Sequence, residues 1–205
     1  LLYTWLCLRP VFMQKSLECE RFAELYRRLA YGGQRNTQAI ALAAMATTLG
    51  ACLLLLYTGM ETMVVSARIL WNTPVLPLLF LSTAFVGGIG MTLLVAALNG
   101  RNDVAPQLNR WLAYSLTATF ALLFLWGGIA LSGASAHTAE ALAALSGSSL
   151  WSTTGLWFLT TSLICLWLAI KRPGSLWPAA LLALHTAWVL RWIVFIGGQG
   201  IPKMG

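Results

Sequence analysis

The chain has 205 residues, of which 59% are hydrophobic and only 9% charged, and its formal net charge is +7. A soluble globular domain carries about 25% charged residues, because it needs polar groups to cover its surface. The composition therefore excludes a soluble protein and predicts an integral membrane protein with almost no soluble domain.

The first part of the chain begins inside an apolar run, residues 1–8, with no Met and no basic segment before it. A secretory signal peptide would open with such a basic segment. We therefore interpret residues 1–8 as the tail of a truncated helix and expect the sequence to be N-terminally incomplete. Residues 9–35 contain six Lys and Arg side chains, which predicts a polar loop.

Five longer apolar stretches follow, each free of Asp, Glu and Lys. A helix needs about 20 apolar residues to cross a bilayer, and none of the stretches alternates as the strands of a barrel do. The sequence predicts an all-α integral membrane protein: a polytopic helical bundle in which 1–205 form a single transmembrane domain. The expected spans are 38–58, 75–98, 111–131, 150–170 and 176–197. Six glycines within them are expected to let helices approach closely: Gly50, Gly87, Gly88, Gly90, Gly127 and Gly128.

The basic residues are distributed unevenly between the loops. Residues 9–35, 99–110 and 171–175 hold ten Lys and Arg, whereas the alternate loops and the C-terminal tail hold only Arg68 and Lys203. Lys and Arg concentrate in cytoplasmic loops, so the first three segments are expected in the cytoplasm. The predicted location is the inner (cytoplasmic) membrane, as a multi-pass protein, and the net charge requires no nucleic acid partner.

Several cofactor sites are disfavoured by the residues available. A haem held between helices is most simply ligated by two facing His side chains, but His137 lies in a loop and leaves His185 alone at membrane depth. The four cysteines form no CxxC motif, so an iron–sulfur cluster or a zinc site is not supported. No nucleotide-binding glycine loop is present.

Five polar side chains gather towards the non-cytoplasmic side or at membrane depth: Tyr57, Glu61, Arg68, His185 and Arg191. An intramembrane Arg usually has a partner or faces a wet cavity, and Glu61 is the expected partner of Arg191. Alternatively, Arg191 extends its guanidinium to the interface, Tyr57 is an interfacial anchor, and His185 makes a hydrogen bond between helices. We take the five as possible quinone-site or proton-handling residues, with no catalytic or metal-binding residue.

Short motifs carry a resemblance to a known family. They read LLYTG at 55–59, WNTP at 71–74, PLLFLS at 77–82 and LRW at 190–192, followed by GQ at 198–199 and PK at 202–203. Over roughly residues 38–205 the chain resembles the polysulfide reductase NrfD-type membrane subunits. The resemblance implies at least eight helices in the whole protein, of which this segment would hold about the last six.

The same resemblance implies a function. The chain would be a haem-free membrane anchor that exchanges electrons between membrane quinol or quinone and an iron–sulfur subunit. That subunit would in turn serve a molybdopterin catalytic subunit. The quinone, menaquinone or ubiquinone, would be a diffusible substrate, and this chain would carry neither haem nor iron–sulfur cluster. Tyr57 is carried over as a quinone contact, although the family's pocket draws mainly on its first helices.

Two other functions stay open from the residues alone. In a transporter or channel, Arg191 and His185 would line a substrate path, but transporters often contain repeated halves, and the sequence shows no internal repeat. A purely structural anchor would need no site at all.

Overall fold

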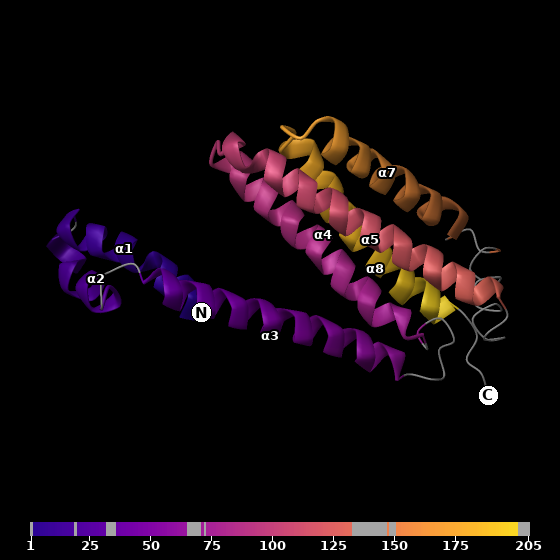
Figure 1. Ribbon diagram of the computed structural model, residues 1–205, viewed down its shortest axis with the longest axis horizontal. Coiled ribbons are helices and arrows are strands. Elements are labelled where there is room, and N and C mark those ends of the chain that lie inside the picture. The colour runs from indigo at the N-terminus through magenta and orange to yellow at the C-terminus, as the bar shows by residue number, and fades with distance from the viewer. Residues whose placement is uncertain are drawn as a thin grey trace. The chain divides into compact units, whose positions relative to one another are not determined.

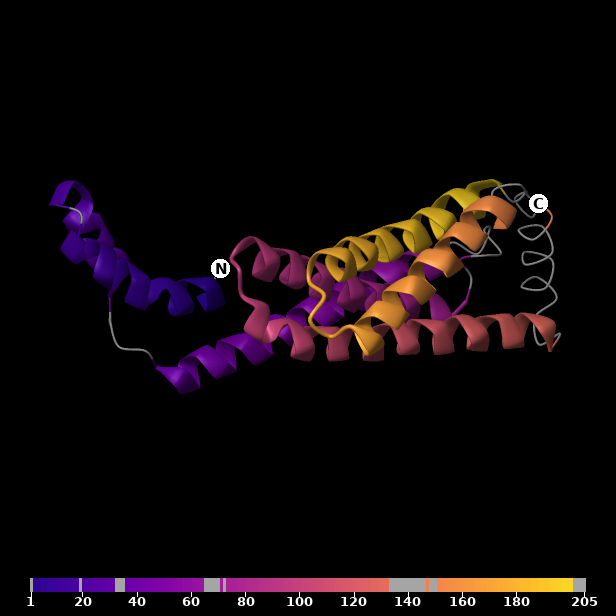
Figure 2. The same ribbon diagram turned by 90° about the horizontal axis from the view of Figure 1, so that it is seen from above.

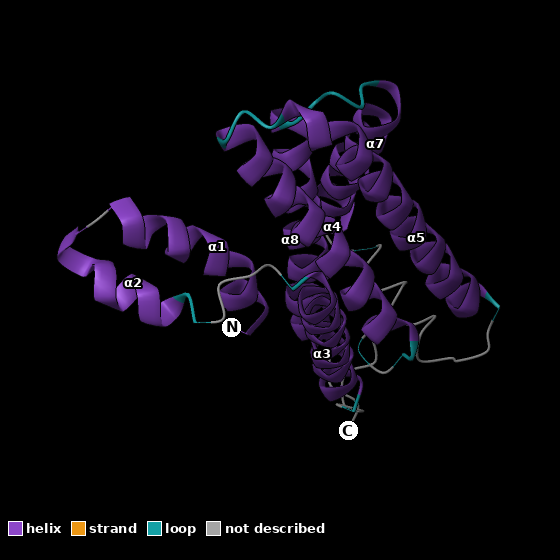
Figure 3. Ribbon diagram, turned by 60° about the vertical axis from the view of Figure 1, so that its left-hand side comes forward, coloured by secondary structure: helices purple, strands orange, loops and turns teal. Residues whose placement is uncertain are grey.

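Figure 1 shows the computed structural model of the chain, which describes residues 2–18, 20–31, 36–64, 71, 73–132, 147 and 151–200. Every regular element in these residues is a helix and none is a strand (Figure 3). The chain divides into two compact units, Leu1–Leu54 and Leu55–Gly205. The expected all-α fold is confirmed.

The first unit contains α1 (Leu2–Glu18), the short η1 (Glu20–Phe22) and α2 (Ala23–Leu29). The indole nitrogen of Trp5 donates to the carbonyl oxygen of Leu29 at 2.9 Å, and the rings of Phe12 and Tyr26 stack at 6.3 Å between centroids. These contacts hold α1 and α2 together as a helical hairpin.

The expected end of the first helix after residue 8 is wrong, because α1 continues through Arg9 and Pro10 to Glu18. The segment after Pro10 is rich in Met, Gln, Lys, Leu and Glu, which have high helix propensity. The change from apolar to charged residues therefore marks the end of a hydrophobic run but not the end of the helix. The expected loop 9–35 is likewise helical over much of its described length.

Helix α3 (Thr37–Met63) begins with a capping interaction, in which the side-chain oxygen of Asn36 accepts from the backbone N–H of Ala39 at 3.1 Å. Its residues from Leu55 onward belong to the second unit. Gly59 is the single buried residue of this helix.

The second unit is a bundle of α4 (Val75–Leu98), α5 (Ala105–Leu131), α7 (Leu156–Lys171) and α8 (Trp177–Gly200), with the short helices η2 (Asn102–Val104) and η3 (Trp151–Gly155) leading into α5 and α7. Figures 1 and 2 show these four long helices side by side. Helix α4 packs against both α5 and α8, and α7 packs against the same two helices.

The closest packing in the bundle depends on small side chains. Ala179, Ala180 and Ala183 of α8 are fully buried, and a Cβ placed on Gly90 of α4 would lie 2.9 Å from the Cβ of Ala183. Small residues let two backbones approach where no larger side chain fits. Bulkier residues such as Leu93 fill the adjacent space.

A buried amide ties together the two turns at one end of the bundle. The side-chain nitrogen of Asn109, on α5, donates to the carbonyl oxygens of Pro173 and Ser175, at 2.7 and 2.9 Å. Those carbonyls belong to the turn between α7 and α8, whereas Asn109 lies near the turn between α4 and α5. The two turns are therefore at the same end of the bundle, as Figures 1 and 2 show.

Five helices in the described part of the chain are long and apolar enough to cross a membrane, judged by length and composition: Thr37–Met63, Val75–Leu98, Asn102–Ile129, Thr153–Lys171 and Trp177–Ile196. They correspond to the five expected spans. The third begins earlier than residue 111, because Arg110 lies on an exposed face at the helix end and does not interrupt the helix. Pro106 stands near the start of α5, where its missing N–H has no intrahelical partner to lose.

Candidate functional site

Helices α3 and α8 both contact the first two turns of α4. We call this region the α3–α4–α8 junction, and its residues are Gly59, Pro77, Phe80 and Arg191. A Cβ on Gly59 would lie 2.4 Å from the Cα of Pro77. On the α8 side, the guanidinium of Arg191 lies 6.0 Å from the centroid of the Phe80 ring. The indole nitrogen of Trp71 also donates to the carbonyl oxygen of Val194 at 2.9 Å.

Tyr57 and Glu61 form a hydrogen-bonded pair near the end of α3. The Tyr57 hydroxyl donates to a carboxylate oxygen of Glu61 at 3.1 Å. The two residues are one helical turn apart, so they lie on the same side of α3. At 3.6 residues per turn, Gly59 lies on the opposite side of the helix, about 180° from the midpoint between them. The pair therefore faces away from Pro77, and 58% of Tyr57 is exposed within the described residues.

Arg191 donates to neutral acceptors on α4. Its Nε lies 3.4 Å from the hydroxyl oxygen of Thr83, and an Nη lies 3.3 Å from the carbonyl oxygen of Phe80. The expected ion pair with Glu61 is not among the ion pairs of the described residues. Glu61 accepts from Tyr57 instead. The guanidinium therefore fastens α8 to α4 within the bundle.

His185 accepts a hydrogen bond between helices. The indole nitrogen of Trp157, on α7, donates to its Nε2 at 2.7 Å, and the two rings meet edge to face with centroids 5.9 Å apart. This is the structural alternative considered for His185 from the sequence. The hydrogen bond links α7 to α8 at a partly exposed position.

The family model for polysulphide reductase, NrfD, matches residues 1–203. The chain belongs to the NrfD family. A tetrathionate reductase subunit from Salmonella typhimurium strain LT2 is 28% identical over 186 residues, which are 88% of this chain and 52% of that protein. This NrfD chain therefore spans about half the length of its curated relative, and no solved structure matches it.

The family match confirms the resemblance that the sequence motifs carry. Within the family, the same motifs are similar to those of the tetrathionate reductase membrane subunit, which agrees with the relative found. Together with the five apolar helices, family membership identifies this NrfD chain as a multi-pass membrane protein. Arg68, the fifth expected site residue, lies outside the described residues, as does His137. Within the described part of the chain, no three His, Cys, Asp or Glu side chains gather as a metal site.

A set of buried hydroxyl groups escaped the sequence analysis of this NrfD chain. Thr119 of α5 donates to the hydroxyl oxygen of Ser82 at 3.2 Å, and the neighbouring Thr83 accepts from Arg191. These contacts connect α5, α4 and α8 through polar groups in an apolar bundle. Ser and Thr side chains in helices often bond to the preceding turn, so their presence alone did not predict these two contacts between helices.

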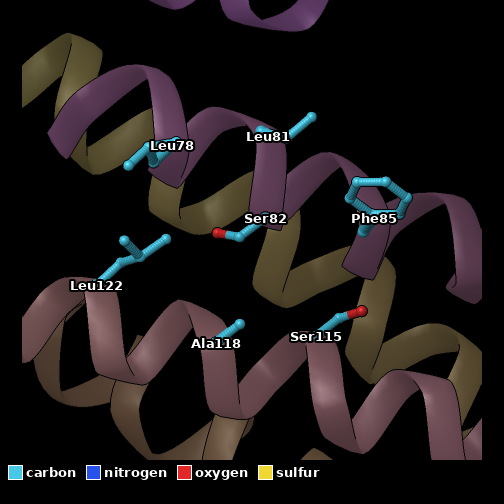
Figure 4. A pocket seen from close by; sticks show the side chains of 7 residues that line it. All are labelled: Leu78, Leu81, Ser82, Phe85, Ser115, Ala118 and Leu122. Atoms are coloured by element: carbon cyan, nitrogen blue, oxygen red, sulfur yellow. The ribbon is translucent and has the colours of Figure 1, made fainter. Parts of the chain in front are cut away.

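Ser82 also borders a groove between α4 and α5, which Figure 4 shows from close by. The groove has a volume of about 230 Å³, and its lining is almost entirely carbon. The lining residues are Leu78, Leu81, Ser82, Phe85, Ser115, Ala118 and Leu122. Because almost no polar surface of Ser82 or Ser115 faces the groove, it offers shape rather than polar recognition.

Proposed function

We propose that this chain is a haem-free membrane subunit of a quinone-linked respiratory oxidoreductase in the inner (cytoplasmic) membrane. It exchanges electrons between membrane quinol or quinone, of the menaquinone or ubiquinone type, and an iron–sulfur subunit. That partner serves a molybdopterin catalytic subunit. Membership of the NrfD family supports the proposal, as does the relative named as a subunit of tetrathionate reductase.

The hydrogen bond from Tyr57 to Glu61 is the observation that carries the proposal. A quinol that is oxidised to a quinone releases two electrons and two protons, so its site needs a group that accepts a proton from the ring hydroxyl. The Tyr57 hydroxyl can accept a hydrogen bond from the quinol while it donates to Glu61. The two protons can pass one after the other along this pair to the carboxylate and from it to water, which is a general-base arrangement, while the two electrons pass to the iron–sulfur partner.

The α3–α4–α8 junction supports this pair from behind. Gly59 fixes the end of α3 on Pro77, and Arg191 fixes the same part of α4 on α8 through Phe80 and Thr83. In this proposal Arg191 is a positioning residue and does not touch the quinol. A rigid support matters because a proton acceptor must lie within hydrogen-bond distance of the group that it deprotonates.

The distribution of charge supports the proposed orientation. Arg101 and Arg110 lie at the turn between α4 and α5. Lys171 ends α7 and Arg172 begins the turn to α8, and all four residues are exposed. Because Asn109 ties the two turns together, these charges gather at one end of the bundle, as cytoplasmic basic residues do. The Tyr57–Glu61 pair would then lie towards the opposite side of the membrane.

Quinol-driven electron transfer tests the proposal directly. Membranes containing the full-length subunit and its complex are given a reduced short-chain quinol, and reduction of the iron–sulfur partner is followed. We expect transfer that depends on this subunit, and co-purification of an iron–sulfur and a molybdopterin protein. Equal transfer in membranes that lack the subunit would refute the proposal.

A further inference from the structure

A second group of aromatic side chains lies at the surface of α7 and α8. Trp157 of α7 and His185, Trp188 and Trp192 of α8 form what we call the α7–α8 aromatic face. Residues 185, 188 and 192 follow helical spacing, so they lie on one side of α8. The indole rings of Trp188 and Trp192 stack with centroids 6.5 Å apart and planes inclined by 28°. Trp157 and Trp188 are 57% and 63% exposed.

Part of this face lies deeper than tryptophan usually does. Trp side chains in membrane proteins concentrate at the two interfaces. His185 and Trp188, however, stand on either side of the midpoint of the Trp177–Ile196 span. Trp188 precedes Ile196 by eight residues, or about 12 Å at 1.5 Å per residue. By the same count, Trp157 lies four residues, or about 6 Å, from the start of the Thr153–Lys171 span. The face therefore extends from near one end of the spans towards their middle.

The hydrogen bond from Trp157 determines which proton His185 carries. An indole N–H can only donate, so the Nε2 of His185 must be the acceptor in the 2.7 Å contact. A neutral imidazole then has its proton on Nδ1. Among the described residues, the Trp157 contact is the one hydrogen bond of His185, which leaves Nδ1–H as a donor at the surface of the bundle.

A donor at this depth requires an acceptor that the bilayer core does not supply. Hydrocarbon chains have no acceptor atoms, and the core contains no water to replace them. Among the described residues, Trp157 is the one hydrogen-bond partner of His185, and no carbonyl oxygen of α7 accepts from its Nδ1. A quinone dissolved in the membrane carries ring carbonyl oxygens, and its flat ring matches the exposed indole of Trp188, because aromatic rings stack with an offset.

We infer that the α7–α8 aromatic face binds the ring of a membrane quinone, separately from the Tyr57–Glu61 pair. His185 donates from Nδ1 to a ring carbonyl oxygen, Trp188 stacks on the ring, and Trp157 holds the imidazole in the required tautomer. The inference rests on the proposed function only in its choice of a quinone as ligand. It describes binding and includes no electron transfer at this face.

Photolabelling of the assembled complex tests this inference. A photoreactive azidoquinone is added to membranes containing the full-length subunit, and the labelled peptides are mapped by mass spectrometry. We expect label on the α8 peptide around Trp188. His185→Phe keeps an aromatic ring but removes the donor, and it should reduce this label about fivefold, as expected for one hydrogen bond. Trp188→Leu should reduce it at least as much.

Two further variants make the result specific. Trp167→Leu removes an α7 tryptophan that is similarly exposed, at 53%, and should leave the α8 label unchanged. Trp157→Phe keeps the ring but frees the Nε2 of His185, and it should reduce the label less than His185→Phe does. If either α8 variant fails to assemble, the label on the α8 peptide in Trp157→Phe is the deciding measurement. A reduced label supports the inference, and an unchanged label overturns it.

Other outcomes would overturn the inference. Absence of label on α8, or label that is insensitive to both His185→Phe and Trp188→Leu, would remove the quinone from this face. Efficient cross-linking of Trp188→Cys to another helix or chain would show that protein covers it. Quinol-driven electron transfer is measured in the same membranes. Normal transfer with no α8 label refutes this inference alone, whereas absence of transfer in the wild type refutes the proposed function.

Discussion

Gly59 of α3 lies directly against Pro77 of α4, so that a Cβ on residue 59 would stand 2.4 Å from the Cα of Pro77. This contact places a glycine where the two helix backbones meet. On the opposite side of α3, the same turns present Tyr57 and Glu61. The packing of one side of α3 therefore determines which way the proposed proton-accepting pair faces.

Gly59→Ala should destabilise the junction. The added methyl meets the backbone of Pro77 rather than a flexible side chain, so the helices must separate, and overpacking of this kind costs about 1–3 kcal/mol. Thermal unfolding of the purified subunit in detergent measures the change. Gly50→Ala is the matched control in α3, because nothing lies within 4 Å of a Cβ there and alanine is the better helix former. Equal stability of both variants would contradict the described contact.

Arg191→Lys should not be silent. The guanidinium donates from two different nitrogens, to Thr83 and to Phe80, and a lysine ammonium cannot reproduce that planar fork. We expect a loss of stability of about 1 kcal/mol, and Thr83→Val should produce part of the same loss. Double-mutant analysis of thermal unfolding checks the coupling. A Lys variant as stable as the wild type would indicate that Arg191 only extends to the interface.

The proposed topology predicts opposite accessibility of two loops. Single cysteines are introduced at Gly174, in the turn between α7 and α8, and at Ser146, in a background without native cysteines. A membrane-impermeant thiol reagent should label Ser146→Cys from the non-cytoplasmic side and Gly174→Cys from the cytoplasmic side, because basic residues concentrate in cytoplasmic loops. The reverse pattern would invert the orientation and place Tyr57 towards the cytoplasm.

The proposed absence of haem has a spectroscopic test. His185 accepts a hydrogen bond from Trp157 through Nε2, so this nitrogen is not available for iron. We expect the full-length subunit to show no Soret absorption after purification. A stoichiometric b-type spectrum that disappears in His185→Ala would show that this chain ligates a haem.

The sequence predicted the helices better than it predicted their faces. Runs of about 20 apolar residues determine which segments can cross a membrane, and the five expected spans correspond to five helices of the described chain. A helix that is apolar all round has no pattern to show which side packs. Gly90 and Gly87 do meet α8 within 4 Å, whereas Gly88 and Gly127 meet nothing within that distance.

The partners of the polar residues were harder to predict. Opposite charge suggested that Arg191 pairs with Glu61, but Arg191 donates to a hydroxyl and a carbonyl of α4. Glu61 and Tyr57 are separated by one helical turn, a relation that the sequence spacing contains. Local pairs along one helix can be predicted from spacing, whereas pairs between helices depend on rotations that the sequence does not specify.

Tyr57→Phe tests the central claim most directly. The change removes the hydroxyl that donates to Glu61 and keeps the ring, so the complex should assemble normally. Tyr114→Phe is the matched control, because Tyr114 of α5 is also exposed, at 68%, and lies outside the junction. Quinol-driven reduction of the iron–sulfur partner, normalised to assembled complex, should fall by about 10- to 100-fold in Tyr57→Phe and stay unchanged in Tyr114→Phe. Wild-type rates in both variants would contradict a quinol site at Tyr57 and Glu61.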